Sequence, residues 1–395
     1  MNAHMLKTKY CNLELKNPFI AASAGTTMNY DRCKRAEDAG FAAVVLKSVQ
    51  EELIMRYNPN PRFELIHQGI PGYSADTFYC YEQAFEKGID EYCEEIVRCK
   101  NGLEIPTIAS INCINLETWE AYAIACEQAG ADALEIVTSC PSGLLMRSGQ
   151  DIVSISIDAL KRTKKAVKIP VGVKMTMQLS NPFLFALSLA DAGADTLIQY
   201  NRFTGCEIDI ETMAPILHKG YAGHGGPWIR QLNMRWMIET WPHLNIPVSA
   251  TGGITRWEDV IQYILCGAST VQICSLIYLK GYDCVKGLLK GVSDYMENHN
   301  LSCIADLIGT ASNNLVDNLS ADRSKRFYAV VDKKNCIKCR KCENICLYNA
   351  LSYGDEGPVI NKTLCDGCNL CVSICKSGAI SLRTHNFEKM EIVHE

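Results

Sequence analysis

Eight short apolar runs rich in valine and isoleucine recur between residues 19 and 276. They are residues 19–24, 42–48, 106–112, 133–139, 170–176, 196–202, 247–253 and 270–276. Amphipathic segments separate most of these runs, and several of them close with an Ala-Gly or Cys-Gly pair, which is typical of a helix end. Continuously apolar strands that alternate with helices indicate a parallel sheet, because the helices cover both of its faces.

The number of repeats favours a closed barrel. Eight such units fit a (β/α)8 barrel better than an open, doubly wound sheet, which is the alternative, and no early GxGxxG is present. We therefore expect an α/β fold in which residues 1–305 form the barrel. Two longer connections, 49–83 and 203–231, are expected to be loops over one mouth of the barrel, where long loops usually carry function.

Two cysteine runs mark a second, smaller domain. Each has the spacing C-x2-C-x2-C-x3-C, and the eight residues are Cys336, Cys339, Cys342, Cys346, Cys365, Cys368, Cys371 and Cys375. This is the bacterial ferredoxin spacing for two [4Fe-4S] clusters, in which the fourth cysteine of each run ligates the other cluster. A pair of zinc sites is the alternative, but those normally use two CxxC pairs separated by a spacer. We expect a polar linker at 306–327, a small α+β ferredoxin-like domain at 328–385 and a loose tail at 386–395.

Composition and charge limit the protein class. We expect a cytoplasmic protein from its N-terminal sequence, and the reducing cytosol argues against a disulfide framework for the 21 cysteines. A net charge of −5 without a strongly basic segment gives nucleic-acid binding no electrostatic support. The first residues lack an apolar core of signal-peptide length, and no run of membrane-spanning length occurs, so we expect no membrane association.

Polar residues gather where the expected strands end. In a (β/α)8 barrel, the active site lies at the carboxyl ends of the strands. Cys140 follows residues 133–139 and precedes a proline, which prevents a regular helix there. A lone strand-end lysine more often faces solvent, but several polar residues at one mouth favour a site: Lys47, Asn112, Lys174, Asn201 and Arg202.

Two short segments come at the ends of the last two expected strands. They are the glycine-containing "ATGGI" at 250–254 and "ICS" at 273–275. The loops after the seventh and eighth strands of such barrels often bind phosphate, and paired glycines let backbone N–H groups approach an anion. A tight strand-to-helix turn explains "TGG" equally well, so both interpretations stay open.

Together these motifs resemble the dihydroorotate dehydrogenase family, in the branch of dihydropyrimidine dehydrogenases with a C-terminal two-cluster module. The resemblance covers nearly the whole chain, and its segments are "NPFIAASA", "LKS", "TSCPSG", "KMT", "YNRFTG", "GHGGPWIR", "SATGGI" and "VQICS", followed by the cysteine runs. It implies an FMN in the barrel mouth, bound by Ala22, Lys47, Asn112, Lys174, Gly226, Gly252, Gly253, Cys274 and Ser275. It also implies that Cys140 exchanges a proton with the substrate while hydride passes to or from the flavin.

The chain departs from this family where the substrate should lie. The resemblance would place asparagines at Cys80 and Val137, a histidine at Ser142, and an Asn-Thr pair where Asn201 and Arg202 stand. A pyrimidine ring would lose hydrogen-bond partners, and leaving buried polar groups unpaired costs binding energy. Arg202 favours a carboxylate, unless it faces solvent. The substrate residues are therefore expected to be Cys80, Asn201 and Arg202.

The resemblance implies an oxidoreductase that acts on a CH–CH or C=C bond beside a carbonyl, with electrons passing between two [4Fe-4S] clusters and FMN. The alternatives are a non-pyrimidine, carboxylate-bearing substrate, or an electron-transfer subunit without small-molecule turnover. Because no nicotinamide-binding fold is visible, the electron partner is expected to be an FAD- or NAD(P)-binding subunit or a ferredoxin. We expect a homodimer or a hetero-oligomer.

Overall fold

The computed structural model describes residues 5–51, 63–70, 73–80, 88–138, 152–216, 222–317, 319–322 and 324–386. Contacts divide the chain into two compact units, Met1–Leu315 and Val316–Glu395.

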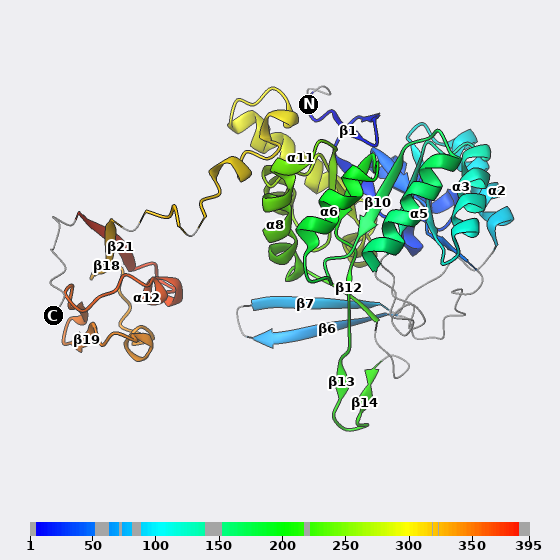
Figure 1. Cartoon of the computed structure of the whole chain (residues 1–395). Helices are drawn as coiled ribbons and strands as arrows, with labels where there is room; N and C mark the ends of the chain where they lie inside the picture. Colours follow the sequence, from blue (N-terminus) through cyan, green and yellow to red (C-terminus); the bar gives the residue numbers. More distant parts are fainter. Residues whose placement is uncertain are drawn as a thin grey trace. The chain divides into compact units, whose positions relative to one another are not determined.

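The first unit contains a closed barrel of eight parallel strands (Figure 1). Its strands are β3 (Phe19–Ala21), β4 (Ala43–Val45), β8 (Thr107–Asn112), β9 (Ala133–Val137), β10 (Val171–Met175), β11 (Thr196–Gln199), β16 (Val248–Thr251) and β17 (Thr270–Ile273). They pair in the order β4-β3-β17-β16-β11-β10-β9-β8, and a further pairing of β4 with β8 closes the ring. The two-residue strand β5 (Val49–Gln50) also pairs with β8. The predicted (β/α)8 barrel is thus confirmed, and the open-sheet alternative is wrong.

Helices surround the barrel, and one of them, the short α10, lies at its mouth. They are α1 (Tyr30–Ala39), α2 (Ile89–Gly102), α3 (Leu116–Gln128), α5 (Ile152–Ala166), α6 (Pro182–Asp191), α8 (Ile229–Thr240), α9 (Trp257–Leu265), α10 (Ser275–Lys280) and α11 (Cys284–Asn298). Their ends follow local chemistry, as α1 shows. The Asn29 side chain accepts a hydrogen bond from the backbone N–H of Arg32, and Gly40 ends the helix at φ +120°, which an L side chain rarely adopts.

The two long connections are not simple loops, and this part of the prediction is wrong. They supply the four strands of one antiparallel sheet, in the order β12-β15-β7-β6: β6 (Phe63–Ile70), β7 (Tyr73–Cys80), β12 (Phe203–Gly205) and β15 (Ala222–Gly225). A second small hairpin, β13 (Ile208–Asp209) with β14 (Ala214–Pro215), extends from the same side of the barrel (Figure 1). We call the four-stranded sheet the cap sheet.

An N-terminal hairpin closes the opposite end of the barrel. It consists of β1 (Thr8–Tyr10) and β2 (Leu13–Leu15). The Thr8 hydroxyl donates to the carbonyl oxygen of Ser269, directly before β17, so the hairpin lies at the amino ends of the strands. Tyr10 and Cys11 are fully buried against apolar side chains of the barrel interior. The amino end is therefore filled, and the carboxyl end is left for a site.

The second unit is small. Its elements are β18 (Lys325–Val331) paired with β21 (Ile380–Asn386), β19 (Leu351–Gly354) paired with β20 (Gly357–Ile360), and the short helix α12 (Leu370–Ile374). A compact apolar cluster that includes Ala329, Leu351 and Ile380 holds these elements together. This is the predicted α+β ferredoxin-like arrangement.

The segment between the barrel and β18 packs partly on the barrel. Ile304 and Leu307 lie in a short 3-10 helix and are buried in the main core. The backbone N–H of Gly309 donates to the Ile264 carbonyl oxygen (3.0 Å), and that of Ala311 to the Leu265 carbonyl oxygen (2.9 Å). Within the described ranges, no helix is long and apolar enough to cross a membrane.

Candidate active site at the barrel mouth

One pocket opens at the carboxyl ends of the barrel strands. Its empty space is about 1170 Å³, including the part that is open to solvent. Each of the eight strands contributes a residue at or just beyond its end: Ala22, Lys47, Asn112, Val137, Lys174, Asn201, Gly252 and Cys274. The cap sheet adds Phe78, Cys80, Gly223, His224 and Gly225.

The pocket brings together eleven of the site residues expected from the sequence. They are Ala22, Lys47, Cys80, Asn112, Lys174, Asn201, Arg202, Gly252, Gly253, Cys274 and Ser275. Gly226 does not line the pocket, but a Cβ built on Gly253 would lie 2.9 Å from the Gly226 carbonyl oxygen, so the two backbones are in close approach. Cys140 lies outside the described residues, although β9, which precedes it, ends at this mouth.

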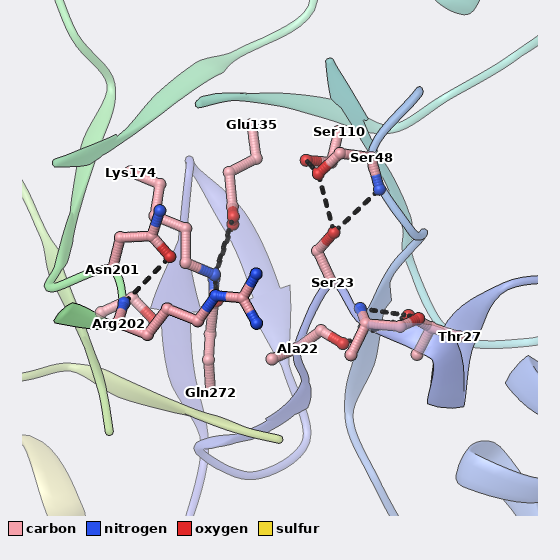
Figure 2. A network of polar contacts seen from close by, with 12 residues as sticks. Ala22, Ser23, Thr27, Ser48, Ser110, Glu135, Lys174, Asn201, Arg202 and Gln272 are labelled. Atoms are coloured by element: carbon pink, nitrogen blue, oxygen red, sulfur yellow. Dashed lines mark hydrogen bonds and ion pairs between the residues drawn. The ribbon is translucent and has the colours of Figure 1, made fainter. Parts of the chain in front are cut away.

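Lys174 lies at the pocket floor beside a buried carboxylate (Figure 2). Its ammonium nitrogen is 3.3 Å from Glu135 Oε1 and donates to Gln272 Oε1 at 3.1 Å. Gln272 Nε2 in turn donates to Glu135 Oε2 at 2.7 Å, and the Tyr10 hydroxyl donates to the same oxygen at 3.2 Å. Because Glu135 is 0% exposed, this network holds a lysine charge at a fixed place inside the barrel.

A ladder of serine hydroxyls fixes the neighbouring strand ends (Figure 2). Ser23 Oγ lies 3.0 Å from Ser48 Oγ and accepts the Ser48 backbone N–H. Ser48 Oγ lies 2.7 Å from Ser110 Oγ. The preceding residue, Lys47, donates its backbone N–H to the Thr27 carbonyl oxygen. Hydrogen bonds from two successive backbone N–H groups, those of Lys47 and Ser48, therefore fix the backbone here.

The glycine turn after β16 forms a backbone cradle. Gly252 and Gly253 both have left-handed φ values, +100° and +73°. Asn233 Nδ2 donates to the Thr251 carbonyl oxygen (2.7 Å), and the Tyr263 hydroxyl donates to that of Gly252 (2.7 Å). These hydrogen bonds fix the carbonyl groups of the turn, and the glycines have no Cβ that would block a ligand. Such a turn can present its backbone N–H groups to a phosphate.

Arg202 is among the residues that line the pocket. Its backbone N–H donates to Asn201 Oδ1 (3.0 Å), and its Nη1 donates to the Cys80 carbonyl oxygen on β7 (3.3 Å). A Cβ on Gly223 would lie 2.2 Å from Arg202 Cδ and Nε, so the absence of a side chain there makes room for the guanidinium.

An aromatic wall was not anticipated from the sequence. Phe63 on β6, Phe78 on β7 and Tyr278 on α10 form a cluster with ring centroids 5.1 to 5.5 Å apart, and Phe78 and Tyr278 line the pocket. The available signal was two aromatic-containing segments around the Pro71-Gly72 turn dipeptide, which is typical of a hairpin. His224 was also missed; burial lowers its pKa.

The cysteines of the second unit fall into two sets. A pocket of about 390 Å³ is lined by Cys365, Cys368 and Cys371 of the second run together with Cys346 of the first. Burial raises the pKa of Cys342, and the neighbouring Cys339, Cys336 and Cys375 raise it further, which places the last cysteine of the second run near the first run. Among the described residues, no three His, Cys, Asp or Glu side chains are grouped to hold a single metal ion.

Comparisons with known proteins agree with this architecture. Residues 5–296 match the dihydroorotate dehydrogenase family, and residues 317–380 match a 4Fe-4S dicluster domain.

Curated relatives are similar over most of the chain. The NAD-dependent dihydropyrimidine dehydrogenase subunit PreA of Escherichia coli is 28% identical over 86% of this chain and 85% of its own. The catalytic subunit of dihydroorotate dehydrogenase B (NAD(+)) of Methanocaldococcus jannaschii is 32% identical over 79% of this chain and 99% of its own, and that of Pyrococcus abyssi is 30% identical over 78% and 99%. The chain therefore belongs to the dihydroorotate dehydrogenase family and carries a 4Fe-4S dicluster domain at its C-terminal side.

Proposed function

We propose that the chain is an FMN- and iron-sulfur-dependent oxidoreductase that interconverts a CH–CH bond and a C=C bond beside a carbonyl. The observation that carries this proposal is the pocket itself. It joins two lysines, a glycine cradle and residues at the ends of all eight strands, several of them polar, in one space. Cofactor and substrate sites are expected in such concave, largely preformed pockets at the carboxyl end of a barrel.

The pocket fits FMN. Gly252, Gly253 and Ser275 would hold the phosphate, since a Cβ on Gly253 would meet the Gly226 carbonyl and close the cradle. Lys174 and Lys47 would lie at the ring system, and Ala22, Asn112 and Cys274 would complete the binding surface. When bound, the flavin supplies hydride transfer and exchanges single electrons with iron-sulfur clusters.

Cys140 is proposed as the acid or base. Reduction of a C=C bond adds a hydride equivalent to one carbon and a proton to the other. The thiol would give that proton and become a thiolate, which solvent then reprotonates; in the oxidative direction the thiolate would accept it. A thiol with an ordinary pKa near ~8.5 suits both roles after modest adjustment by its surroundings.

The second unit is proposed to hold two [4Fe-4S] clusters. One would be ligated by Cys336, Cys339, Cys342 and Cys375, and the other by Cys365, Cys368, Cys371 and Cys346. The pocket shared by the second run and Cys346 supports this exchange of fourth ligands, which is a feature of two-cluster ferredoxins. The clusters would carry electrons between the flavin and an external partner.

An external electron partner is part of the proposal. The relatives include proteins named as an NAD-dependent subunit and as a catalytic subunit of an NAD(+) enzyme. Because the sequence has no GxGxxG after a strand, an FAD- or NAD(P)-binding subunit or a ferredoxin would connect this chain to the nicotinamide pool. We propose a hetero-oligomer, with a homodimer of this chain as the alternative.

A second candidate function is an electron-transfer subunit that turns over no small molecule. It is favoured by Cys80 and Val137, which line the pocket at positions where the family resemblance calls for substrate-binding asparagines.

One anaerobic experiment separates the two candidates. The purified chain, reconstituted with iron, sulfide and FMN, is bleached with dithionite and then mixed with unsaturated carbonyl compounds. The proposed enzyme should regain flavin absorbance with at least one acceptor, while a pure electron carrier should stay bleached with all of them. Absence of bound FMN would contradict both the site assignment and the proposed chemistry.

A further inference from the structure

The two cysteine runs of the second unit share one spacing but differ in charge. Residues 332–346, which contain the first run, include five basic and two acidic residues, while the equivalent residues 361–375 include one of each. Between its first and third cysteines the first run has Lys338, Arg340 and Lys341, whereas the second has one acidic residue and no basic one. Because the whole chain has a net charge of −5, the first run departs from the charge of its surroundings.

Two of these basic residues occupy backbone positions that do not favour them. Lys338 and Arg340 have left-handed φ values, +53° and +61°. The equivalent residues of the second run are Gly367 and Asn369, both at φ +70°. Glycine and asparagine adopt this conformation more readily than lysine or arginine. The turn itself therefore gives no reason for the two cations, which favours a role for them in binding.

The basic loop surrounds an exposed cysteine. Cys339 lies between Lys338 and Arg340 in the sequence, and all three residues are exposed. Lys338 Nζ donates to the Asp355 carbonyl oxygen (3.1 Å), and the Arg340 guanidinium carbon lies 4.5 Å from the centre of the Tyr353 ring. Both contacts are with the β19–β20 hairpin, so this hairpin positions both cations beside the first run.

Acidic neighbours balance part of this charge. Lys333 forms an ion pair with Glu356 on the hairpin turn, and Arg340 Nε lies 3.7 Å from a carboxylate oxygen of Glu343. Ion pairs at the surface contribute little, so they compete only weakly with the carboxylates of a partner. The exposed cations around the first run, which we call the basic face, are Lys334, Lys338, Arg340 and Lys341.

The surroundings of the second run are apolar instead. Leu364 and Leu370 belong to this run and are exposed. Leu347, also exposed, directly follows Cys346, which shares a pocket with the second run. Charge therefore distinguishes the first run from the second, although the two have the same cysteine spacing.

A basic face of this kind suits an acidic partner. Complementary charges speed the encounter of two proteins and fix their relative orientation. Since the chain as a whole is negative, an acidic protein is repelled by most of it and attracted at the basic face. The exposed Cys339 at this face is a proposed cluster ligand, so a protein bound here lies beside the cluster.

We propose that the basic face is the docking site of a small acidic protein that carries single electrons. This inference rests on the proposed function, since it assumes that the first run holds a [4Fe-4S] cluster. In the docked complex the carrier is oxidised by one electron while the chain is reduced by one, or the reverse, and no bond is made or broken. Attraction by charge makes the complex sensitive to salt, because ions screen exposed charges.

Binding of an acidic carrier tests the basic face. The chain, reconstituted with iron, sulfide and FMN, is titrated with an acidic plant-type ferredoxin, and dissociation constants are measured calorimetrically at about 20 mM and about 300 mM salt. We expect binding at low salt that weakens strongly at high salt. Vesicles of phosphatidylserine serve as the comparison, since an anionic lipid surface also attracts cations.

The second run supplies the residues for the decisive variant. Lys338→Gly with Arg340→Asn gives the first run the residues that the second has at the same left-handed positions, so the turn and the iron content should be kept. Removing two exposed cations should weaken ferredoxin binding by roughly 2- to 30-fold at low salt. Lys338→Arg with Arg340→Lys keeps both charges and should retain most of the binding.

Two further variants complete the design. Arg235→Gln with Lys290→Gln removes two exposed cations from α8 and α11 of the barrel and should leave ferredoxin binding nearly unchanged. If the Gly/Asn variant loses iron, Lys334→Gln with Lys341→Gln takes its place, because it leaves both left-handed residues as they are.

The outcomes separate the two levels of inference. A cluster-loaded chain that does not bind ferredoxin, or binds it equally at both salt concentrations, overturns the docking site and leaves the proposed function standing. Equal binding by the wild type and the charge-removing variants does the same, and binding to the vesicles but not to ferredoxin assigns the face to a lipid surface instead. A chain that takes up no iron-sulfur cluster overturns the proposed function first.

Discussion

At the scale of single residues, buried side chains that contact the pocket-lining residues fix where those residues lie. Lys174 faces the pocket, but Glu135 and Gln272 decide where its charge lies. Glu135 has the opposite charge and no exposure, so it balances the lysine without touching a ligand. A sequence pattern shows a glutamate in an apolar strand but not which charge it meets.

Replacing Glu135 by Gln should destabilise the chain strongly. The lysine would keep its buried position and lose its counter-charge, which typically costs about 3–5 kcal/mol. Urea unfolding followed by circular dichroism measures the change. The double variant Glu135→Gln, Lys174→Met should recover part of the loss, because no buried charge then remains unpaired. A loss below about 1 kcal/mol in the single variant would show that the pair is better solvated than its burial indicates.

Cys140→Ser tests the proposed proton donor. The hydroxyl is a much weaker acid than a thiol, so substrate-linked flavin reoxidation should slow by about 10²–10⁴-fold. Bleaching by dithionite should be unchanged, because that step needs no substrate proton. FMN and iron content should also be unchanged, and their loss would mean a structural cysteine instead. Full activity would assign the proton to another group or to water.

At the scale of elements, turns and the cap sheet supply much of the pocket lining, while the barrel strands provide fixed ends. The TGG turn is held by α8 and α9 through Asn233 and Tyr263. The cap sheet brings β7 and β15 together although Cys80 and its strand partner Gly223 are 143 positions apart in the sequence. No single element forms the pocket; it lies where the strand ends, the turns and the cap sheet come together.

Gly253→Ala should remove FMN from an otherwise folded barrel. Its φ of +73° is unfavourable for alanine, and the added Cβ would lie 2.9 Å from the Gly226 carbonyl oxygen, inside the cradle. The FMN-to-protein ratio after reconstitution measures the effect. Gly193→Ala is the matched control, since its φ is +98° and nothing lies within 4 Å of the added Cβ. Equal FMN loss in both variants would mean that backbone strain, not the close approach, disturbs binding.

The cap sheet also marks the limit of reading elements from the sequence. The eight barrel strands were predictable because strands buried on both faces are continuously apolar. The β6 strand, FELIHQGI, and the β7 strand, YSADTFYC, mix apolar and polar residues without a clean alternation. Their pairing with β12 and β15 depends on contacts far apart in the sequence, and no local pattern records those contacts.

At the scale of the whole molecule, the two units would have different functions. The barrel would carry out the chemistry, and the second unit would pass electrons to a partner. The polar segment that follows the 3-10 helices on the barrel, from about residue 315 onward, links them.

The purified chain alone should therefore react slowly with NADH. No nicotinamide-binding motif follows a strand in the sequence, so reduction of the bound flavin must wait for a partner protein. Anaerobic stopped-flow mixing with NADH, read at the flavin absorbance, checks this. Bleaching at rates near typical turnover, ~10 s⁻¹, would contradict the expectation and indicate an unrecognised nicotinamide site. Dithionite serves as the positive control.

The sequence by itself determined the barrel, the cluster-binding module and the strand-end residues that gather at the mouth. These features follow from local rules: periodic burial, fixed cysteine spacing and the position of a residue relative to its own strand. Only the tertiary structure decided the orientation of Arg202, the counter-charge of Lys174 and the existence of the cap sheet. The physical reason is that each of these depends on a partner distant in the chain, such as Gly223 for Arg202, and that partner is close only after folding.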